Sequence, residues 1–127
     1  ISSPTTSPIY TNGSNLTISG SCTDGYTVEL SGSATESATC ASNAFTFNVT
    51  KTSDATYSFA VSQKNLSNVS SGAVSVQWIR DTSNPNAPSV SEPASSPYYS
   101  RSSTFNLSGN CETGASVDIS GSDTSSV

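Results

Sequence analysis

The sequence has 127 residues, a formal net charge of −5 and only four basic residues, which are scattered along the chain. Nucleic-acid binding and docking on an anionic membrane both require clustered Lys and Arg, so neither partner is expected. Histidine is absent. It is the commonest general base and metal ligand, so we expect a protein that is not an enzyme. No apolar run approaches the ~20 residues that a transmembrane helix needs, so membrane insertion is not expected.

Alternating apolar residues recur along the first two thirds of the chain and predict short, half-buried strands. A Pro-rich edge strand is expected near Ile9 and Tyr10, and a short strand through Thr39 and Cys40. The other expected strands carry, in chain order, Leu16 and Ile18; Tyr26, Val28 and Leu30; Phe45, Phe47 and Val49; Tyr57, Phe59 and Val61; and Val74, Val76 and Trp78. Gly, Asn, Asp and Ser clusters separate these sets. About seven short strands at this spacing predict an all-β fold of the sandwich type.

The chain contains an internal repeat. Thr11–Ser33 aligns without a gap with Ser100–Ser122 at an offset of 89 positions, and the match extends back to Ile1 and Val90. Identical pairs include Gly20/Gly109, Cys22/Cys111, Gly25/Gly114, Val28/Val117 and Tyr10/Tyr99. An offset of this size is the length of a sandwich domain and not of a solenoid repeat.

We therefore predict a complete domain over residues 1–89 and the N-terminal part of a second, truncated repeat over residues 90–127. The connecting segment Asp81–Val90 contains two prolines and is expected to be extended. Half a sandwich leaves an apolar face bare, so residues 90–127 are not expected to fold alone. Either further chain or strand-mediated self-association would have to cover them.

The cysteines predict one disulfide. Cys22 and Cys40 lie at the ends of adjacent strand segments, and a bond between them would close a short loop. The alternative is a pair of free, buried thiols. Cys111 is the repeat equivalent of Cys22, and its partner would lie beyond the chain end. A disulfide favours an oxidising compartment, so we expect an extracellular or cell-surface protein.

Four segments resemble the Ig-like domains that occur in tandem in bacterial surface proteins and adhesins. They are ISGSCTDGYTVELSGS, CASNAFTFNVT, DATYSFAVSQKNLSNVSS and VSVQWIRDTSNPNAPSV. The resemblance implies an immunoglobulin-like β-sandwich, with Tyr57 in the structural position called the tyrosine corner. The cysteine spacing is local and departs from the long inter-sheet bond of antibody domains, so antibody-type recognition is not carried over.

The resemblance also implies a function. Such repeats act as the stalk or as binding modules of an adhesin, and their partners are a protein or glycan on another surface or the neighbouring repeats. The alternative is a structural subunit of an extracellular filament or phage tail fibre. An exposed apolar patch at one end would favour binding, and a bare polar surface would favour a spacer.

A calcium site at the junction of the two repeats is a weaker candidate. Asp81 and Asn84 are its proposed ligands, with Asn86 and either Glu112 or Asp24 as further oxygen donors. The chain has no dense Asp-x-Asp pattern, so a hydrogen-bonded turn without metal is the favoured interpretation.

Aromatic residues offer a second weak candidate. Tyr98 and Tyr99 lie on the first expected strand of the second repeat, and only one of them can face its core. The other is a candidate for an exposed ligand contact. Trp78 alternates with two valines, so core packing is expected for it instead.

Overall fold

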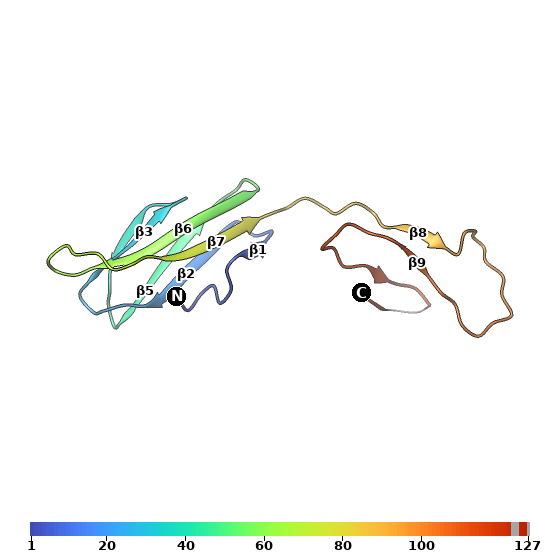
Figure 1. Ribbon diagram of the computed structural model, residues 1–127, viewed down its shortest axis with the longest axis horizontal. Coiled ribbons are helices and arrows are strands. Elements are labelled where there is room, and N and C mark those ends of the chain that lie inside the picture. The colour runs from blue at the N-terminus through green and yellow to red at the C-terminus, as the bar shows by residue number, and fades with distance from the viewer. Residues whose placement is uncertain (123–124, 127) are drawn as a thin grey trace. The chain divides into compact units, whose positions relative to one another are not determined.

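The computed structural model describes residues 1–122 and 125–126, and these residues form strands and loops without a helix. The chain divides into two compact units, Ile1–Thr82 and Ser83–Val127. The division falls inside the segment Asp81–Val90 that was predicted to connect the repeats. Figure 1 shows the strands of both units.

Two sheets form the first unit. The larger sheet has the strand order β1-β7-β6-β3-β4, with β1 parallel to β7 and every other pair antiparallel. The smaller sheet pairs β2 with β5 in antiparallel fashion. The bounds are Ile9–Thr11 (β1), Asn15–Ser21 (β2), Thr27–Gly32 (β3), Glu36–Thr39 (β4), Ala44–Thr50 (β5), Ala55–Lys64 (β6) and Val74–Arg80 (β7). The predicted strands are thus confirmed, and the arrangement is consistent with a β-sandwich.

The two sheets share one apolar core. Alternate residues of each strand are buried because successive side chains of a strand point to opposite faces. The buried hydrophobic residues are Leu16, Ile18, Val28, Leu30, Cys40, Phe45, Phe47, Val49, Phe59, Val61, Val76 and Trp78. Val74 differs from the prediction, since its side chain is half exposed at the start of β7.

Trp78 anchors this core, and its predicted packing role is confirmed. The side chain is fully buried, and its ring lies 5.5 Å from that of Tyr57. The indole Nε1 donates a hydrogen bond of 3.0 Å to Thr11 Oγ1 on the neighbouring strand β1. A buried indole N–H needs such a partner, so the edge strand satisfies the polar atom of the largest core residue.

The second unit contains four short strands in its described part. They are β8 (Ser89–Glu92), β9 (Ser108–Asn110), β10 (Asp118–Ile119) and β11 (Ser125–Ser126), and they form the pairs β8–β9 and β10–β11. Counterparts of β5, β6 and β7 do not occur among the residues described in this unit.

Three strand pairings of the second unit match pairings of the first at the offset of 89 positions. Each of the following pairs has an equivalent: Glu92 with Ser108 corresponds to Ser3 with Ser19, Asp118 with Ser126 to Glu29 with Ser37, and Ile119 with Ser125 to Leu30 with Glu36. The turn after β2 is also matched, because Gly25 and Gly114 both have a positive φ, of 79° and 88°. The backbone geometry is therefore the same at these three pairs and at this turn.

Candidate functional site

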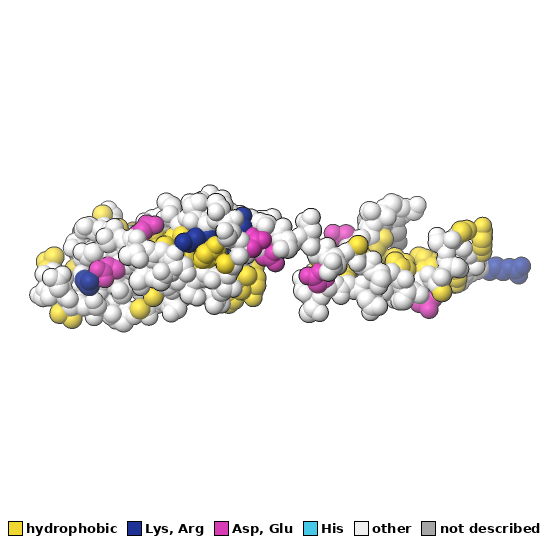
Figure 2. Space-filling view, turned by 90° about the horizontal axis from the view of Figure 1, so that it is seen from above, with side chains coloured by type: hydrophobic (Ala, Val, Ile, Leu, Met, Phe, Trp, Pro, Cys, Tyr) yellow, Lys and Arg dark blue, Asp and Glu magenta, His cyan; other side chains and the backbone are white. Residues whose placement is uncertain are grey.

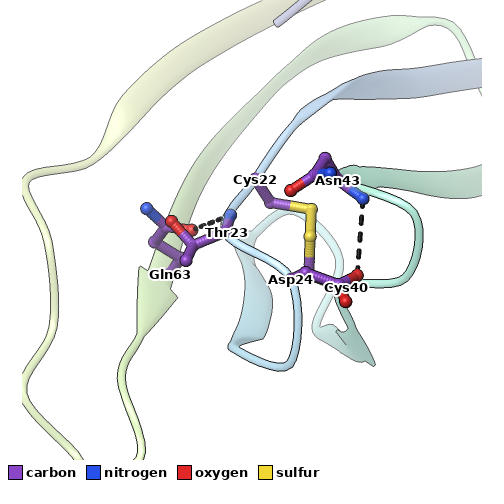
Figure 3. Close-up of a disulfide and its surroundings, with 6 residues drawn as sticks. All are labelled: Cys22, Thr23, Asp24, Cys40, Asn43 and Gln63. Atoms are coloured by element: carbon purple, nitrogen blue, oxygen red, sulfur yellow. Dashed lines mark hydrogen bonds between the residues drawn. A yellow bond between two sulfur atoms is a disulfide. The ribbon is translucent and has the colours of Figure 1, made fainter.

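The predicted disulfide joins two turns at one end of the first unit (Figure 3). Cys22 and Cys40 are bonded with their Cα atoms 6.0 Å apart. Around the bond, Thr23 N donates to Gln63 Oε1 at 3.0 Å, and Asn43 N donates to Asp24 Oδ1 at 3.4 Å. The bond is compatible with an oxidising, extracellular compartment. Cys111 is free and exposed.

The hairpin loop between β6 and β7 lies at the same end and presents two apolar side chains to solvent. Leu66 is 86% exposed and Val69 is 62% exposed. Asn65 orders the loop tip, because its Oδ1 accepts hydrogen bonds from Ser67 N at 2.9 Å and from Val69 N at 3.0 Å. We call Leu66 and Val69 the loop-tip pair. The ordered loop therefore leaves both aliphatic side chains available for contact with another molecule.

A small hollow lies beside the loop and is lined in part by Ser71 and Gly72. The hollow next to the disulfide, between Ile1, Phe45 and Val74, has a volume of about 130 Å³. Pockets for drug-sized ligands have volumes of roughly 300–1,000 Å³. This end of the first unit is therefore better suited to contact with a surface than to enclosing a small molecule.

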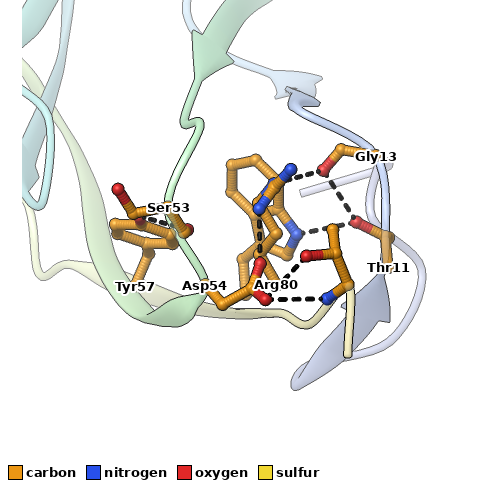
Figure 4. Close-up of polar contacts among 8 residues, drawn as sticks. Thr11, Gly13, Ser53, Asp54, Tyr57 and Arg80 are labelled. Atoms are coloured by element: carbon orange, nitrogen blue, oxygen red, sulfur yellow. Dashed lines mark hydrogen bonds and ion pairs between the residues drawn. The ribbon is translucent and has the colours of Figure 1, made fainter. Parts of the chain in front are cut away.

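A polar network occupies the opposite end of the first unit, where β6 begins and β7 ends (Figure 4). The Asp54 carboxylate pairs with the Arg80 guanidinium and accepts hydrogen bonds from Thr82 N at 3.0 Å and Thr82 Oγ1 at 2.7 Å. Arg80 Nε donates to Gly13 O at 3.1 Å. The network holds the last residues of the unit against the loop before β6.

Tyr57 completes this end of the first unit. Its hydroxyl donates a hydrogen bond of 2.8 Å to Ser53 O, four residues upstream. The Lys51 ammonium lies 5.3 Å from the centre of the Tyr57 ring and donates to Ser33 O at 2.6 Å. These contacts fix the segment between β5 and β6, which is a structural role.

Hydrogen bonds lower the pKa of Asp54 from its ordinary value. The Thr82 backbone N–H contributes most and the Thr82 hydroxyl next; partial desolvation opposes them, and the Arg80 charge adds to the lowering. A carboxylate whose folded pKa lies below its unfolded pKa stabilises the protein above the unfolded value, and this contribution is lost as the pH falls through the folded value.

Replacing Asp54 by Asn should therefore destabilise the first unit at neutral pH, and the difference from the parent should shrink as the pH falls below about 4. Thr82→Val keeps the backbone N–H donor, so it should lower the free energy of unfolding by less than Asp54→Asn does. Its effect should depend on pH in the same way. Urea unfolding followed by Trp78 fluorescence at several acid pH values measures both. If the free energies of unfolding of Asp54→Asn and the parent differed by the same amount across the acid range, the lowered pKa of Asp54 would be contradicted.

The residues predicted as calcium ligands fall in separate units. Asp81 closes the first unit, where its backbone N–H donates to Thr11 O at 3.0 Å. Asn84 lies in the second unit, in which Asn86 N and Nδ2 both donate to Glu112 Oε2, at 3.0 and 3.2 Å. Calcium binding by Asp81 and Asn84 stays a prediction. Within the described residues, no group of three or more His, Cys, Asp and Glu side chains is arranged to hold a metal ion.

The predicted contact tyrosines are both exposed. The prediction that they lie on a strand was wrong, because β8 ends at Glu92 and residues 98–100 have no strand structure. Tyr98 packs its ring 5.9 Å from that of Phe105, while Tyr99 is the more exposed of the two. Tyr10, the repeat equivalent of Tyr99, is exposed on β1 as well. Tyr99 is thus the member of the pair whose ring is open to a ligand, and its use as a contact stays a prediction.

Sequence reasoning missed the loop-tip pair and the Asp54 network. Leu66 and Val69 stand among Ser and Asn residues outside any alternating run. That position could have marked them as exposed aliphatic residues. The network could not have been found in this way, because it depends on the register that brings Ala55 opposite Arg80.

Comparison of the chain with protein-family models, curated proteins and solved structures gave no match. The described residues include no helix that is long and apolar enough to cross a membrane.

Proposed function

We propose that the chain is a non-enzymatic part of an exported, tandem Ig-like repeat protein of bacterial surface type, whose repeats act as the stalk or the binding modules of an adhesin. Immunoglobulin-like sandwiches place strands C, F and G in one sheet and pair B with E in the other. The neighbours β3, β6 and β7 and the pair β2–β5 follow this order when the strands are named in sequence. The topology supports the Ig-like assignment.

The observation that carries the proposal is the repetition of strand pairings at the offset of 89 positions. Three pairs and one turn of the first unit recur in the second unit at equivalent residues. Two copies joined by a Pro-containing segment are the minimal unit of an array. The Cys22–Cys40 bond supports export, because such bonds persist in oxidising compartments.

The loop-tip pair is the surface through which the first unit would make contact. It is apolar and exposed, and it is held by its own hydrogen bonds, so binding would not have to order it first. The expected partner is a protein or glycan on another surface.

Replacing Leu66 and Val69 together by Ser should abolish adhesion and change the free energy of unfolding by no more than about 0.5 kcal/mol, because both side chains are exposed. Beads that carry the full chain would be tested against immobilised glycans and extracellular proteins. Tyr10→Ser, which removes an exposed aromatic side chain from β1, is the matched control. Equal adhesion of the parent and the double variant would exclude the loop as the contact. If the parent chain adhered to none of the immobilised molecules, the role of a stalk would be favoured over that of a binding module.

The second candidate function is a subunit of an extracellular filament or tail fibre. One observation favours it, namely the apolar groove of the second unit, which is lined by Val90, Leu107, Val117 and Ile119. A groove that accepts a strand from another molecule would allow head-to-tail assembly.

A further inference from the structure

The turn between β1 and β2 contains the only Asn-Gly sequence of the chain, Asn12-Gly13. Both residues are exposed. An asparagine loses its side-chain amide when the backbone nitrogen of the next residue attacks the side-chain carbon, and glycine has no Cβ atom to hinder that attack. The repeat equivalent is Arg101-Ser102, so the second unit lacks the reactive pair.

The two groups that would react are free of hydrogen bonds to the described residues. These groups are the side-chain amide of Asn12 and the backbone N–H of Gly13. By contrast, the side-chain oxygens of Asn15, Asn48 and Asn65 each accept a hydrogen bond. Each of those three residues is also followed by Leu or Val. Asn12 therefore combines a free amide with an unhindered neighbour.

The turn has room around Gly13. Apart from its chain neighbours, the nearest atom to a Cβ placed on this glycine is Thr11 Oγ1, at 4.0 Å. Gly13 is not among the glycines with a positive φ. Alanine can therefore replace Gly13 without a clash or backbone strain, which makes this substitution a usable control.

The residues on either side of Asn12 are held by the core and by the polar network at this end of the first unit (Figure 4). Thr11 Oγ1 accepts a hydrogen bond of 3.0 Å from the Trp78 indole N–H. Gly13 O accepts one of 3.1 Å from Arg80 Nε. A longer backbone between Thr11 and Gly13 would therefore disturb the contacts of the largest core residue and of the end of β7.

We propose that Asn12 is a site of spontaneous deamidation and that isoaspartate formed there loosens the first unit. Hydroxide removes the N–H proton of Gly13, and the nitrogen attacks Asn12 Cγ. A C–N bond forms, the bond from Cγ to Nδ2 breaks, and the amide nitrogen takes a proton from water and leaves as ammonia. A second water opens the resulting succinimide at either carbonyl carbon, which gives aspartate or isoaspartate.

The isoaspartate product changes the backbone as well as the charge. Its main chain runs through the former side chain and is longer by a carbon atom, at the position between the two anchored residues Thr11 and Gly13. The reaction consumes water and needs no enzyme. The inference goes beyond the proposed function and does not depend on it.

Either product adds a negative charge to a chain that has few charges. The sequence contains four basic and nine acidic residues, and charged side chains are sparse on the face that Figure 2 shows. The deamidated protein should therefore elute later than the parent from an anion-exchange column.

The test is to incubate the full chain in warm, mildly alkaline buffer and to follow the late-eluting form with time. Peptide mapping should place the change at Asn12, as two products of equal mass that separate as aspartate and isoaspartate. Gly13→Ala keeps Asn12 and is the matched control. It should slow the change at least ~10-fold, because a Cβ atom hinders the attacking nitrogen. The parent unfolded in urea gives the reference rate.

A second measurement tests the effect on the fold. The isoaspartate form should unfold at a lower urea concentration than the parent, as followed by Trp78 fluorescence. Asn12→Asp carries the added charge on an ordinary backbone and should unfold close to the parent. A loss in Asn12→Asp as large as that in the isoaspartate form would overturn the role of the backbone.

Three outcomes would overturn the site itself. The first is a folded chain that stays unchanged while the urea-unfolded chain deamidates. The second is an equal rate for Gly13→Ala and the parent, and the third is a product that maps to another asparagine.

Discussion

Replacing Cys22 and Cys40 together by Ala should lower the free energy of unfolding of the first unit by about 3 kcal/mol. The bond closes a loop with a sequence separation of 18 residues, and without it the unfolded chain gains conformational freedom. Alanine is the right replacement because Cys40 is buried, and a serine hydroxyl there would need a hydrogen-bond partner. Trp78 is the only tryptophan and lies in the first unit, so urea unfolding followed by its fluorescence reports this unit alone.

Cys111→Ala is the matched control for this experiment. Cys111 is exposed and free, so its replacement should change the same transition by less than about 0.5 kcal/mol. Reducing the parent protein with a thiol should reproduce the loss seen in the double variant. If the double variant and the parent unfolded at the same urea concentration, the bond would not contribute to the stability of this end.

The strands of the first unit could be predicted because each has one buried face. Phe45, Phe47 and Val49 alternate with polar residues, and this period of two needs no knowledge of what lies opposite. Val74 belongs to the same pattern on β7 but is half exposed. The period of two predicts which side chains share a face of the sheet. It does not predict how far the opposing sheet covers that face.

The sequence pattern could not predict the order of the strands or the polar contacts between them. The parallel pairing of Ile9 with Trp78 joins residues far apart in the chain, and no local signal specifies it. The contacts of Asp54 with Arg80 and Thr82 follow from the register of β6 on β7, which brings Ala55 opposite Arg80. The loop-tip pair depends on the turn that Asn65 caps, which periodicity does not reveal.

The disulfide was predictable for a different reason. Cys22 and Cys40 lie close together in the sequence, and the repeat showed that Cys111 has no partner within the chain. The same repeat predicted a second unit, because residues 90–122 align with the start of the first. Three of its strand pairings occur at positions equivalent to pairings of the first unit.

The last prediction compares equivalent positions of the two repeats. Ile18→Ala should lower the free energy of unfolding by about 2–5 kcal/mol, because it removes a fully buried side chain from a packed core. Leu107 occupies the equivalent position in the second unit, but its side chain is half exposed and no opposing sheet covers it. Leu107→Ala should therefore change the unfolding of the chain by less than about 0.5 kcal/mol.

Calorimetry of the full chain measures this difference and shows which residues unfold cooperatively. At roughly 0.7 kcal/mol per residue near 60 °C, a transition of residues 1–82 alone has an enthalpy of about 57 kcal/mol, and one of all 127 residues about 89 kcal/mol. We expect a single transition near the lower value, and amide hydrogens of β2, β5 and β6 that exchange far more slowly than those of residues 104–110. A second cooperative transition, or equal losses for Ile18→Ala and Leu107→Ala, would show that the second unit has a packed core of its own.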